Sequence, residues 1–207
     1  MNQKQLWEKL AKENSRYYIN SDKGRNISEE DFIKSGEEDC DRFVFNDPLI
    51  EDLGSCLEIG CGTGRMTEFL ADFFPKVYAV DISGEMIRQG KERLQGLNNI
   101  EWVETNGETL PFPTESVDFI FSYIVFQHIK TPEMVQETFK EAYRVLQPYG
   151  LFKVRLRTDN VDDKMDSWWA GVSFSKEKMD ELIKDSGFKL LDSEPVEDYG
   201  IWLWLVK

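Results

Sequence analysis

From residue 55 onward, short apolar runs alternate with apolar positions at helical spacing. The short runs predict buried strands, and apolar residues that recur every three or four positions predict amphipathic helices. The expected strands are 55–59, 77–81, 100–104, 117–122, 151–157, 188–194 and 201–206, and the expected helices are 65–74, 84–95, 132–146 and 176–186. Strands and helices that alternate with short connections predict a doubly wound α/β fold.

Signals at the ends of the last elements support these boundaries. Thr131 and Pro132 are an N-cap and a first-turn proline, and Gly187 ends the last helix. Only about Val196 to Gly200 separate the final two strands. Such a connection is too short for a crossover, so the final two strands should pair antiparallel.

The N-terminal part predicts helices without strands. Residues 3–13 have an apolar side typical of an amphipathic helix, and residues 15–27 are expected to form a loop. Ser28 and Asp31 resemble a capping box that opens a second helix, which should end or kink near Pro48. We therefore expect a helical cap over residues 1–50 and a main domain over residues 51–207, forming one structural domain overall.

Composition and charge narrow the class of protein. The chain has 207 residues and 41% hydrophobic residues, enough for one α/β domain with a full core. No segment approaches the length that spans a bilayer, and the first residues lack a signal-peptide core, so a cytoplasmic location is expected. A net charge of −14 repels nucleic acid and anionic membranes, and we expect neither as a partner. The negative net charge mildly favours a cationic ligand. A monomer or homodimer is expected.

The three cysteines do not form a metal motif. Cys40, Cys56 and Cys61 lack the spacing of a metal site, so no metal is expected. Cys56 lies in the first predicted strand and is expected in the core. Cys61 has two interpretations: a redox-active or ligand-contacting thiol, or a small side chain that fits a tight turn.

The candidate chemistry begins where the first predicted strand ends. A glycine-rich turn, Gly60-Cys61-Gly62-Thr63-Gly64, connects that strand to a helix. Glycine permits positive φ and lets another molecule lie against bare backbone, and helix N-terminal N–H groups face the same place. The second strand ends at Asp81, where a carboxylate is placed to accept hydrogen bonds from two vicinal hydroxyls, such as those of a ribose.

The spacing of these residues resembles a known family. Glu58-x-Gly60-x-Gly62-x-Gly64 resembles motif I of the class I S-adenosylmethionine (SAM)-dependent methyltransferases, and Asp81 stands where that family has its ribose-binding acid. The resemblance implies a Rossmann-like doubly wound sheet with strand order 3-2-1-4-5-7-6 and strand 7 antiparallel. It also implies SAM as cofactor and S-adenosylhomocysteine as product.

The resemblance continues along the chain to about residue 207. Residues 105–112 resemble the family's segment after the third strand, with Asn106 where aspartate is commoner. Residues 141–155 resemble the family's helix, turn and fifth strand, with Tyr149 in place of a glycine. Residues 116–129 and 173–192 resemble the fourth strand and the final helix with its strand.

The resemblance implies a set of cofactor-binding residues around one crevice. They are Glu58, Gly60, Cys61, Gly62, Gly64, Arg65, Asp81, Ile82, Met86, Asn106, Gly107, Glu108, Ser122 and Tyr123. Glu58 either contacts the amino group of the methionine moiety through water or satisfies N–H groups of the turn. Arg65 either meets the cofactor carboxylate or is a solvated arginine at a helix start.

The acceptor side carries fewer signals. His128 and Tyr123 are the candidate catalytic residues, but His128 also fits a structural role in its loop, and Tyr123 also fits simple packing. The candidate substrate and lid residues are Tyr17, Tyr18, Gln127, His128, Trp168 and Trp169. Core packing is the alternative for the tryptophans.

These residues favour one function and leave two alternatives. The leading hypothesis is a methyltransferase that moves a methyl group by SN2 displacement to an unidentified small-molecule acceptor. That reaction needs alignment and exclusion of water rather than a catalytic triad. The alternatives are a catalytically silent SAM-binding regulatory or scaffold subunit, and a nicotinamide oxidoreductase, whose fingerprint requires a glycine where Arg65 stands.

Overall fold

The computed structural model describes residues 1–50, 53–159, 168–196 and 199–207. The strands are β1 (Ser55–Ile59), β2 (Lys76–Asp81), β3 (Ile100–Glu104), β4 (Val117–Ser122), β5 (Leu146–Arg157), β6 (Lys189–Val196) and β7 (Gly200–Val206). Their order is β3-β2-β1-β4-β5-β7-β6, and β7 is antiparallel to β5 and β6. The predicted Rossmann-like order and the reversed last strand are therefore confirmed.

The chain divides into two compact units, Met1–Asn106 and Gly107–Lys207, which are called here the N-terminal and C-terminal units. The predicted division at residue 50 into a helical cap and a main domain stays a prediction. None of the helices in the described part of the chain combines the length and apolar character needed to cross a membrane.

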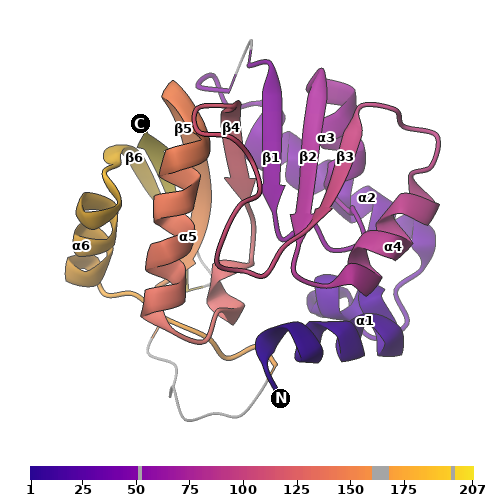
Figure 1. The fold of residues 1–207 in the computed structure, drawn as a ribbon. Coiled ribbons are helices and arrows are strands. Elements are labelled where there is room, and N and C mark those ends of the chain that lie inside the picture. Colours follow the sequence, from indigo (N-terminus) through magenta and orange to yellow (C-terminus); the bar gives the residue numbers. More distant parts are fainter. Residues whose placement is uncertain (51–52, 160–167, 197–198) are drawn as a thin grey trace. The chain divides into compact units, whose positions relative to one another are not determined.

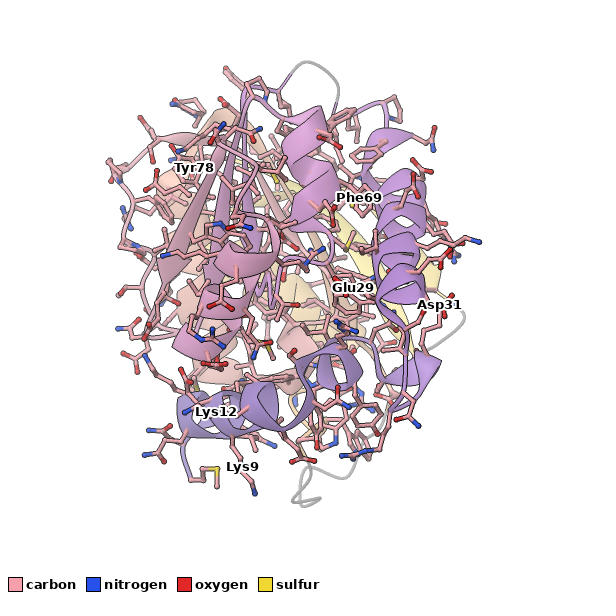
Figure 2. All side chains as sticks on the ribbon, turned by 90° about the vertical axis from the view of Figure 1, so that its right-hand side faces the viewer. Lys9, Lys12, Glu29, Asp31, Phe69 and Tyr78 are labelled. Atoms are coloured by element: carbon pink, nitrogen blue, oxygen red, sulfur yellow. The ribbon has the colours of Figure 1, made fainter. Side chains whose placement is uncertain are left out.

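The N-terminal unit contains β1, β2 and β3, which pair in parallel. Its helices are α1 (Gln3–Ile19), α2 (Glu29–Cys40), α3 (Thr67–Phe73) and α4 (Gly84–Arg93). Figure 1 shows α1 near the carboxyl ends of β1 and β2. The glycine turn follows β1, and Asp81 is the last residue of β2. Lys9 and Lys12 lie on the exposed side of α1, while Leu10 and Ala11 are buried (Figure 2).

The first helix is longer than predicted, so the expected loop over residues 15–27 is wrong at its start. Asn14 interrupts α1 with φ −168° and ψ 81°. The Asn14 side chain then accepts a hydrogen bond from the Tyr17 N–H at 3.2 Å, which caps a second helical piece that ends at Ile19. A short 3₁₀ turn, η1 (Ser21–Lys23), follows.

The second helix begins as predicted. The Ser28 hydroxyl accepts a hydrogen bond from the Asp31 N–H at 3.0 Å and caps α2. The helix continues as a five-residue π-helix, η2 (Asp41–Phe45), and is over before Pro48, as expected.

The C-terminal unit contains β4 to β7 with the helices α5 (Pro132–Val145) and α6 (Lys176–Ser186). Both helices lie against the same face of these strands (Figure 1). That face is packed with aromatic rings: Phe152 of β5 lies 5.2 Å from Phe139 of α5 and 5.7 Å from Phe188, between ring centroids. The side chains that alternate with Phe152 along β5 therefore face the other way.

Candidate functional site

The glycine turn after β1 has the backbone that its sequence predicts. Gly60, Gly62 and Gly64 have φ values of 78°, 56° and 82°, a region that favours glycine. The N–H groups of Gly60 and Cys61 both donate to the Val80 carbonyl, at 2.7 and 3.0 Å. The turn is thus held against the end of the neighbouring strand, β2.

Asp81 joins this turn from the end of β2. Its Oδ2 accepts the Gly62 N–H at 2.9 Å, and its Oδ1 accepts the Ser83 N–H at 2.8 Å. Burial raises the pKa of Asp81 to about 6, while these backbone donors oppose the rise. The carboxylate is therefore mainly ionised at pH 7, and each oxygen keeps further acceptor capacity beside the bare turn.

Glu58 is buried beneath the turn, with 6% of its surface exposed. Its Oε2 accepts the Thr67 hydroxyl at 2.5 Å, a donor that neither interpretation from the sequence named. Burial raises the pKa of Glu58 to about 7, and the Thr67 hydrogen bond and the Arg65 charge oppose that rise. Its predicted water-mediated contact with the cofactor stays a prediction.

Arg65 is not a solvated arginine, so that interpretation is wrong. Only 6% of its surface is exposed. Its Nη1 donates to the Asp39 carboxylate at 2.6 Å and to the Ser35 carbonyl at 2.8 Å, both on α2. A Cβ on Gly36 would collide with the Arg65 carbonyl, so the helix approaches the turn closely at that glycine. The predicted contact with a cofactor carboxylate stays a prediction.

The helix after β2, α4, also contacts the glycine turn. The Ser83 hydroxyl accepts the Met86 N–H at 3.2 Å and caps α4. At the far end of α4, Arg93 Nε donates to the Thr63 carbonyl at 3.1 Å, and its guanidinium also contacts the Gly64 carbonyl. Sequence analysis missed Arg93, because its partners lie about 30 residues earlier in the chain.

Three predicted cofactor residues lie in this region with different exposure. Ile82 is half-buried, and Met86 is almost fully buried, with 1% of its surface exposed. Asn106 is exposed and lies two residues beyond β3, after Thr105, whose N–H donates to the Asp81 carbonyl at 2.9 Å. Their predicted roles stay predictions.

The cysteines have no features of a reactive or metal-binding group. Cys40, Cys56 and Cys61 are free and buried, which confirms Cys56 as a core residue. Burial raises the pKa of the Cys61 thiol far above its usual value, which favours the interpretation as a small side chain in the turn. In the described ranges, no cluster of three or more His, Cys, Asp or Glu could hold a metal ion.

The second piece of α1 lies over the glycine turn. A Cβ on Gly62 would lie only 2.8 Å from Ile19 Cδ1. The preceding Tyr17 and Tyr18 pack edge to face, 4.9 Å between centroids, and the Tyr18 hydroxyl donates to Glu13 at 2.8 Å. The predicted lid tyrosines are thus next to the residue that contacts the turn.

Both pieces of α1 are attached to α4. Glu8 Oε1 accepts the Gly84 N–H at 2.6 Å, at the N-terminus of α4. Farther along, Gln89 Nε2 donates to the Ala11 carbonyl at 3.1 Å, and the Ser15 hydroxyl donates to Gln89 Oε1 at 2.7 Å. Sequence analysis missed Glu8 because no local pattern connects residues separated by 76 positions.

The C-terminal unit holds the remaining predicted site residues. Gly107 and Glu108 are its first two residues, and Ser122 is fully buried at the end of β4. Tyr123 follows β4, is half-buried, and stacks on Trp202 of β7 with centroids 5.5 Å apart.

Two of the predicted acceptor-side residues, Gln127 and His128, lie in the short helix η3 (Phe126–His128). His128 stacks on Trp168 with centroids 5.8 Å apart, and the carbonyl of half-buried Gln127 lies against Gly171. Burial, with a smaller contribution from the Arg157 charge, lowers the pKa of His128 to about 4. The imidazole is therefore neutral at pH 7, and its burial and its stacking on Trp168 favour its structural role.

Trp169 packs against a different side chain, Arg157. The Arg157 guanidinium lies over its ring, 5.3 Å from the centroid, and Arg157 also pairs with Asp159. Of the connection between β5 and Trp168, residues 160–167 lie outside the described residues.

The comparisons with known proteins agree with this turn and strand order. Residues 57–154 match the family described as a methyltransferase domain. The solved structure of a SAM-dependent methyltransferase from Aquifex aeolicus covers 87% of this chain and 99% of its own, with a TM-score of 0.63 and 20% identity, a likeness of fold. In sequence over residues 57–154 and in fold, the chain is thus similar to SAM-dependent methyltransferases.

Two curated proteins similar to this chain have names that state a methyl acceptor. Malonyl-[acyl-carrier protein] O-methyltransferase of Marinomonas sp. is 30% identical over 139 residues, which are 66% of this chain and 49% of that protein. Demethylmenaquinone methyltransferase of Tropheryma whipplei is 35% identical over 94 residues, which are 45% of this chain and 38% of that protein. The chain thus spans half or less of the length of these relatives.

Proposed function

We propose that this chain is a SAM-dependent methyltransferase that transfers a methyl group to a small-molecule acceptor. The observation that carries the proposal is the junction of Asp81 with the glycine turn, where one carboxylate oxygen accepts the Gly62 N–H at 2.9 Å. A bare turn beside an ionised carboxylate fits an adenosyl group whose ribose hydroxyls donate to Asp81. The similarity of residues 57–154 to a methyltransferase domain, and of the fold to a SAM-dependent methyltransferase, supports the same proposal.

In this proposal, bound SAM supplies an electrophilic methyl group on a sulfonium that is already a good leaving group. The chain's own task is to bind, to orient and to exclude water. The backbone of Gly60 to Gly64 would hold the cofactor, Asp81 would orient its ribose, and Ile19 would cover the turn. A base is required only if the acceptor must lose a proton.

The acceptor is proposed only as a class. The two named relatives act on chemically different molecules, a malonyl-carrier protein and a demethylmenaquinone, so neither name transfers to this chain. A small molecule as acceptor, a cytoplasmic location and a monomer or homodimer are parts of the proposal. The net charge of −14 supports the exclusion of nucleic acid as a partner.

Cofactor binding is tested by calorimetry with SAM, S-adenosylhomocysteine and NAD. We expect heat with the first two and none with NAD. Asp81→Ala should weaken SAM binding by about 1–3 kcal/mol, because the ribose loses a charged acceptor. Asp72→Ala, which removes an exposed aspartate on α3, is the matched control and should bind as the wild type does. Equal affinity of Asp81→Ala and the control would remove Asp81 from the site.

Turnover separates the enzyme from a silent SAM-binding subunit. Purified protein is incubated with SAM and a cell extract freed of large molecules, and S-adenosylhomocysteine is quantified. A methyltransferase should form it in proportion to its own concentration, and Asp81→Ala should form less at subsaturating SAM. SAM binding without product in any extract would favour the regulatory or scaffold subunit.

A further inference from the structure

One arginine of the N-terminal unit places its guanidinium against main-chain carbonyls of the glycine turn. Arg93 is the last residue of α4, and its Nε donates to the Thr63 carbonyl at 3.1 Å. Its Nη2 donates to the Gly64 carbonyl, and its Nη1 donates to the Glu68 carboxylate at 2.5 Å. All three partners lie outside α4, in the turn and in the first turn of α3. An arginine that served only the dipole of its own helix would not require them.

The guanidinium and its counter-charge are largely shielded from water. The Arg93 side chain is 16% exposed and the Glu68 side chain is 29% exposed. A shielded cation needs acceptors and an opposite charge, and the two carbonyls and the Glu68 carboxylate supply both. The Gly64 carbonyl also accepts the Glu68 N–H at 3.3 Å. The guanidinium and the start of α3 therefore meet at one oxygen of the turn.

The two carbonyls flank a single glycine. The peptide with the Thr63 carbonyl precedes the Gly64 Cα, and the peptide with the Gly64 carbonyl follows it. Because each peptide is planar, holding both carbonyls restricts both backbone dihedrals of Gly64. Its φ is 82°, and a glycine that is not held visits many other conformations. Arg93 therefore keeps the last glycine of the turn in one conformation.

Close packing brings α4 near enough for these contacts. An ideal Cβ on Gly90, three residues before Arg93, would lie 2.4 Å from Trp102 Cζ3 and 3.3 Å from the Thr63 carbonyl carbon. An ideal Cβ on Gly64 would lie 2.8 Å from Trp102 Cη2. The Trp102 ring of β3 thus packs against a glycine of α4 and a glycine of the turn. The helix that carries Arg93 is therefore fixed beside the turn.

We propose that Arg93 is a positioning residue that holds the glycine turn in its cofactor-binding conformation before SAM binds; this rests on the proposed methyltransferase function. In that function the bare backbone of the turn holds the cofactor. A turn that is already ordered loses less conformational entropy when the ligand binds, so affinity rises. Asp81 fixes the turn at Gly62, and Arg93 fixes it at its other end.

The test measures the binding of SAM and of S-adenosylhomocysteine to the full chain by calorimetry. Arg93→Gln should weaken both by about tenfold, because the turn loses the charged donor that orders it. Arg88→Gln is the matched control, since it makes the same change on the same helix and removes an exposed arginine that pairs with Glu85 and Glu92. It should bind both ligands as the wild type does.

The comparison of the two ligands separates position from charge. Loss of a positive charge near the turn makes the local field more negative, which favours the sulfonium of SAM over its uncharged product. A displaced turn weakens both ligands equally. Arg93→Lys adds a second comparison, because it keeps the charge but lacks the fork that reaches both carbonyls. Its affinity for both ligands should fall between those of the wild type and Arg93→Gln.

Nuclear magnetic resonance supplies a readout that a general loss of stability would not change. Without ligand, the amides of Gly62 and Gly64 should give sharp signals in the wild type and in Arg88→Gln. In Arg93→Gln they should broaden, because the turn exchanges between conformations on the microsecond to millisecond timescale. Saturation with S-adenosylhomocysteine should sharpen them again. If circular dichroism shows that Arg93→Gln does not fold, Arg93→Lys takes its place with Arg88→Lys as its control.

The outcomes distinguish this proposal from the proposed function. A wild type that does not bind S-adenosylhomocysteine contradicts the methyltransferase function itself. If the wild type binds it and Arg93→Gln binds it as tightly as Arg88→Gln does, the proposal for Arg93 is overturned and the function stands. The proposal is equally overturned if Arg93→Lys has wild-type affinity, or if the Gly62 and Gly64 signals of Arg93→Gln stay sharp without ligand.

Discussion

At the scale of single residues, Tyr149 shows what a departure from a family pattern does to the backbone. It stands where the family usually has a glycine, and its φ is 66° with 88% of its surface exposed. A left-handed backbone brings the Cβ of an L-residue too close to the next carbonyl oxygen. The exposed ring offers little packing in return, so this residue carries local strain.

Tyr149→Gly should therefore raise the free energy of unfolding by about 0.5–1 kcal/mol, because glycine adopts this φ without the clash. Urea unfolding monitored by circular dichroism measures it. Tyr149→Ala is the control, since it removes the ring but keeps the Cβ and should leave stability nearly unchanged. Equal stabilisation by both variants would mean that the ring, rather than the backbone, is responsible.

The site residues that could be predicted from the sequence are those that belong to a local sequence pattern. Gly60, Gly62 and Gly64 share positive φ within one short turn, and Asp81 ends the next strand. The partner of Arg65 could not be predicted, because Asp39 is 26 positions away and exposed acids near it in sequence look equivalent. Long-range pairs of this kind depend on tertiary packing, which a local pattern does not contain.

At the scale of elements, three of the short strands were the easiest to predict. The bounds of β1, β3 and β4 agree with the sequence, while β5 begins at Leu146 instead of residue 151. Its first residues pair through Leu146 with Val117 across a register shift, in a segment with Pro148 that does not look like a strand. Similarly, the Asn14 interruption hid the second piece of α1, which tertiary contacts with Gln89 support.

The attachment of α1 to α4 gives a prediction at this scale. Glu8→Ala removes the carboxylate that accepts the Gly84 N–H, and a lost helix cap with its favourable charge costs about 1 kcal/mol of unfolding free energy. Hydrogen exchange should also become faster at amides of residues 3–19. Glu37→Ala, which removes an exposed glutamate on α2, is the control. Unchanged exchange in α1 would show that Glu8 does not hold the helix.

At the scale of the whole molecule, the order of the elements was predictable while the packing of the long connections was not. Alternating strands and helices with short connections determine the topology almost completely. The stacking of Trp168 on His128 joins segments 40 positions apart, and no periodicity connects them. The excess of acid is also a property of the whole chain, with 39 Asp and Glu against 25 Lys and Arg.

This charge predicts a difference between cofactor and product. SAM carries a sulfonium charge that S-adenosylhomocysteine lacks, so a negative protein field attracts SAM more strongly. Raising the salt from about 0.02 M to about 0.5 M should weaken SAM binding relative to product by about two- to threefold, because screening shortens the reach of that field. Calorimetry at both salt concentrations measures the ratio, and uncharged adenosine is the control ligand. A ratio independent of salt would contradict the prediction.

The contact between Ile19 and Gly62 affects how a molecule can reach the glycine turn. Because Ile19 lies where a side chain on Gly62 would be, the clearance above the turn depends on a residue at the end of α1. The interruption at Asn14 separates that end from the piece that carries Glu8, and both pieces contact α4, through Glu8 and through Ser15. The size of one aliphatic side chain, Ile19, therefore sets the space above the turn, while the contacts of both pieces with α4 hold α1 in place.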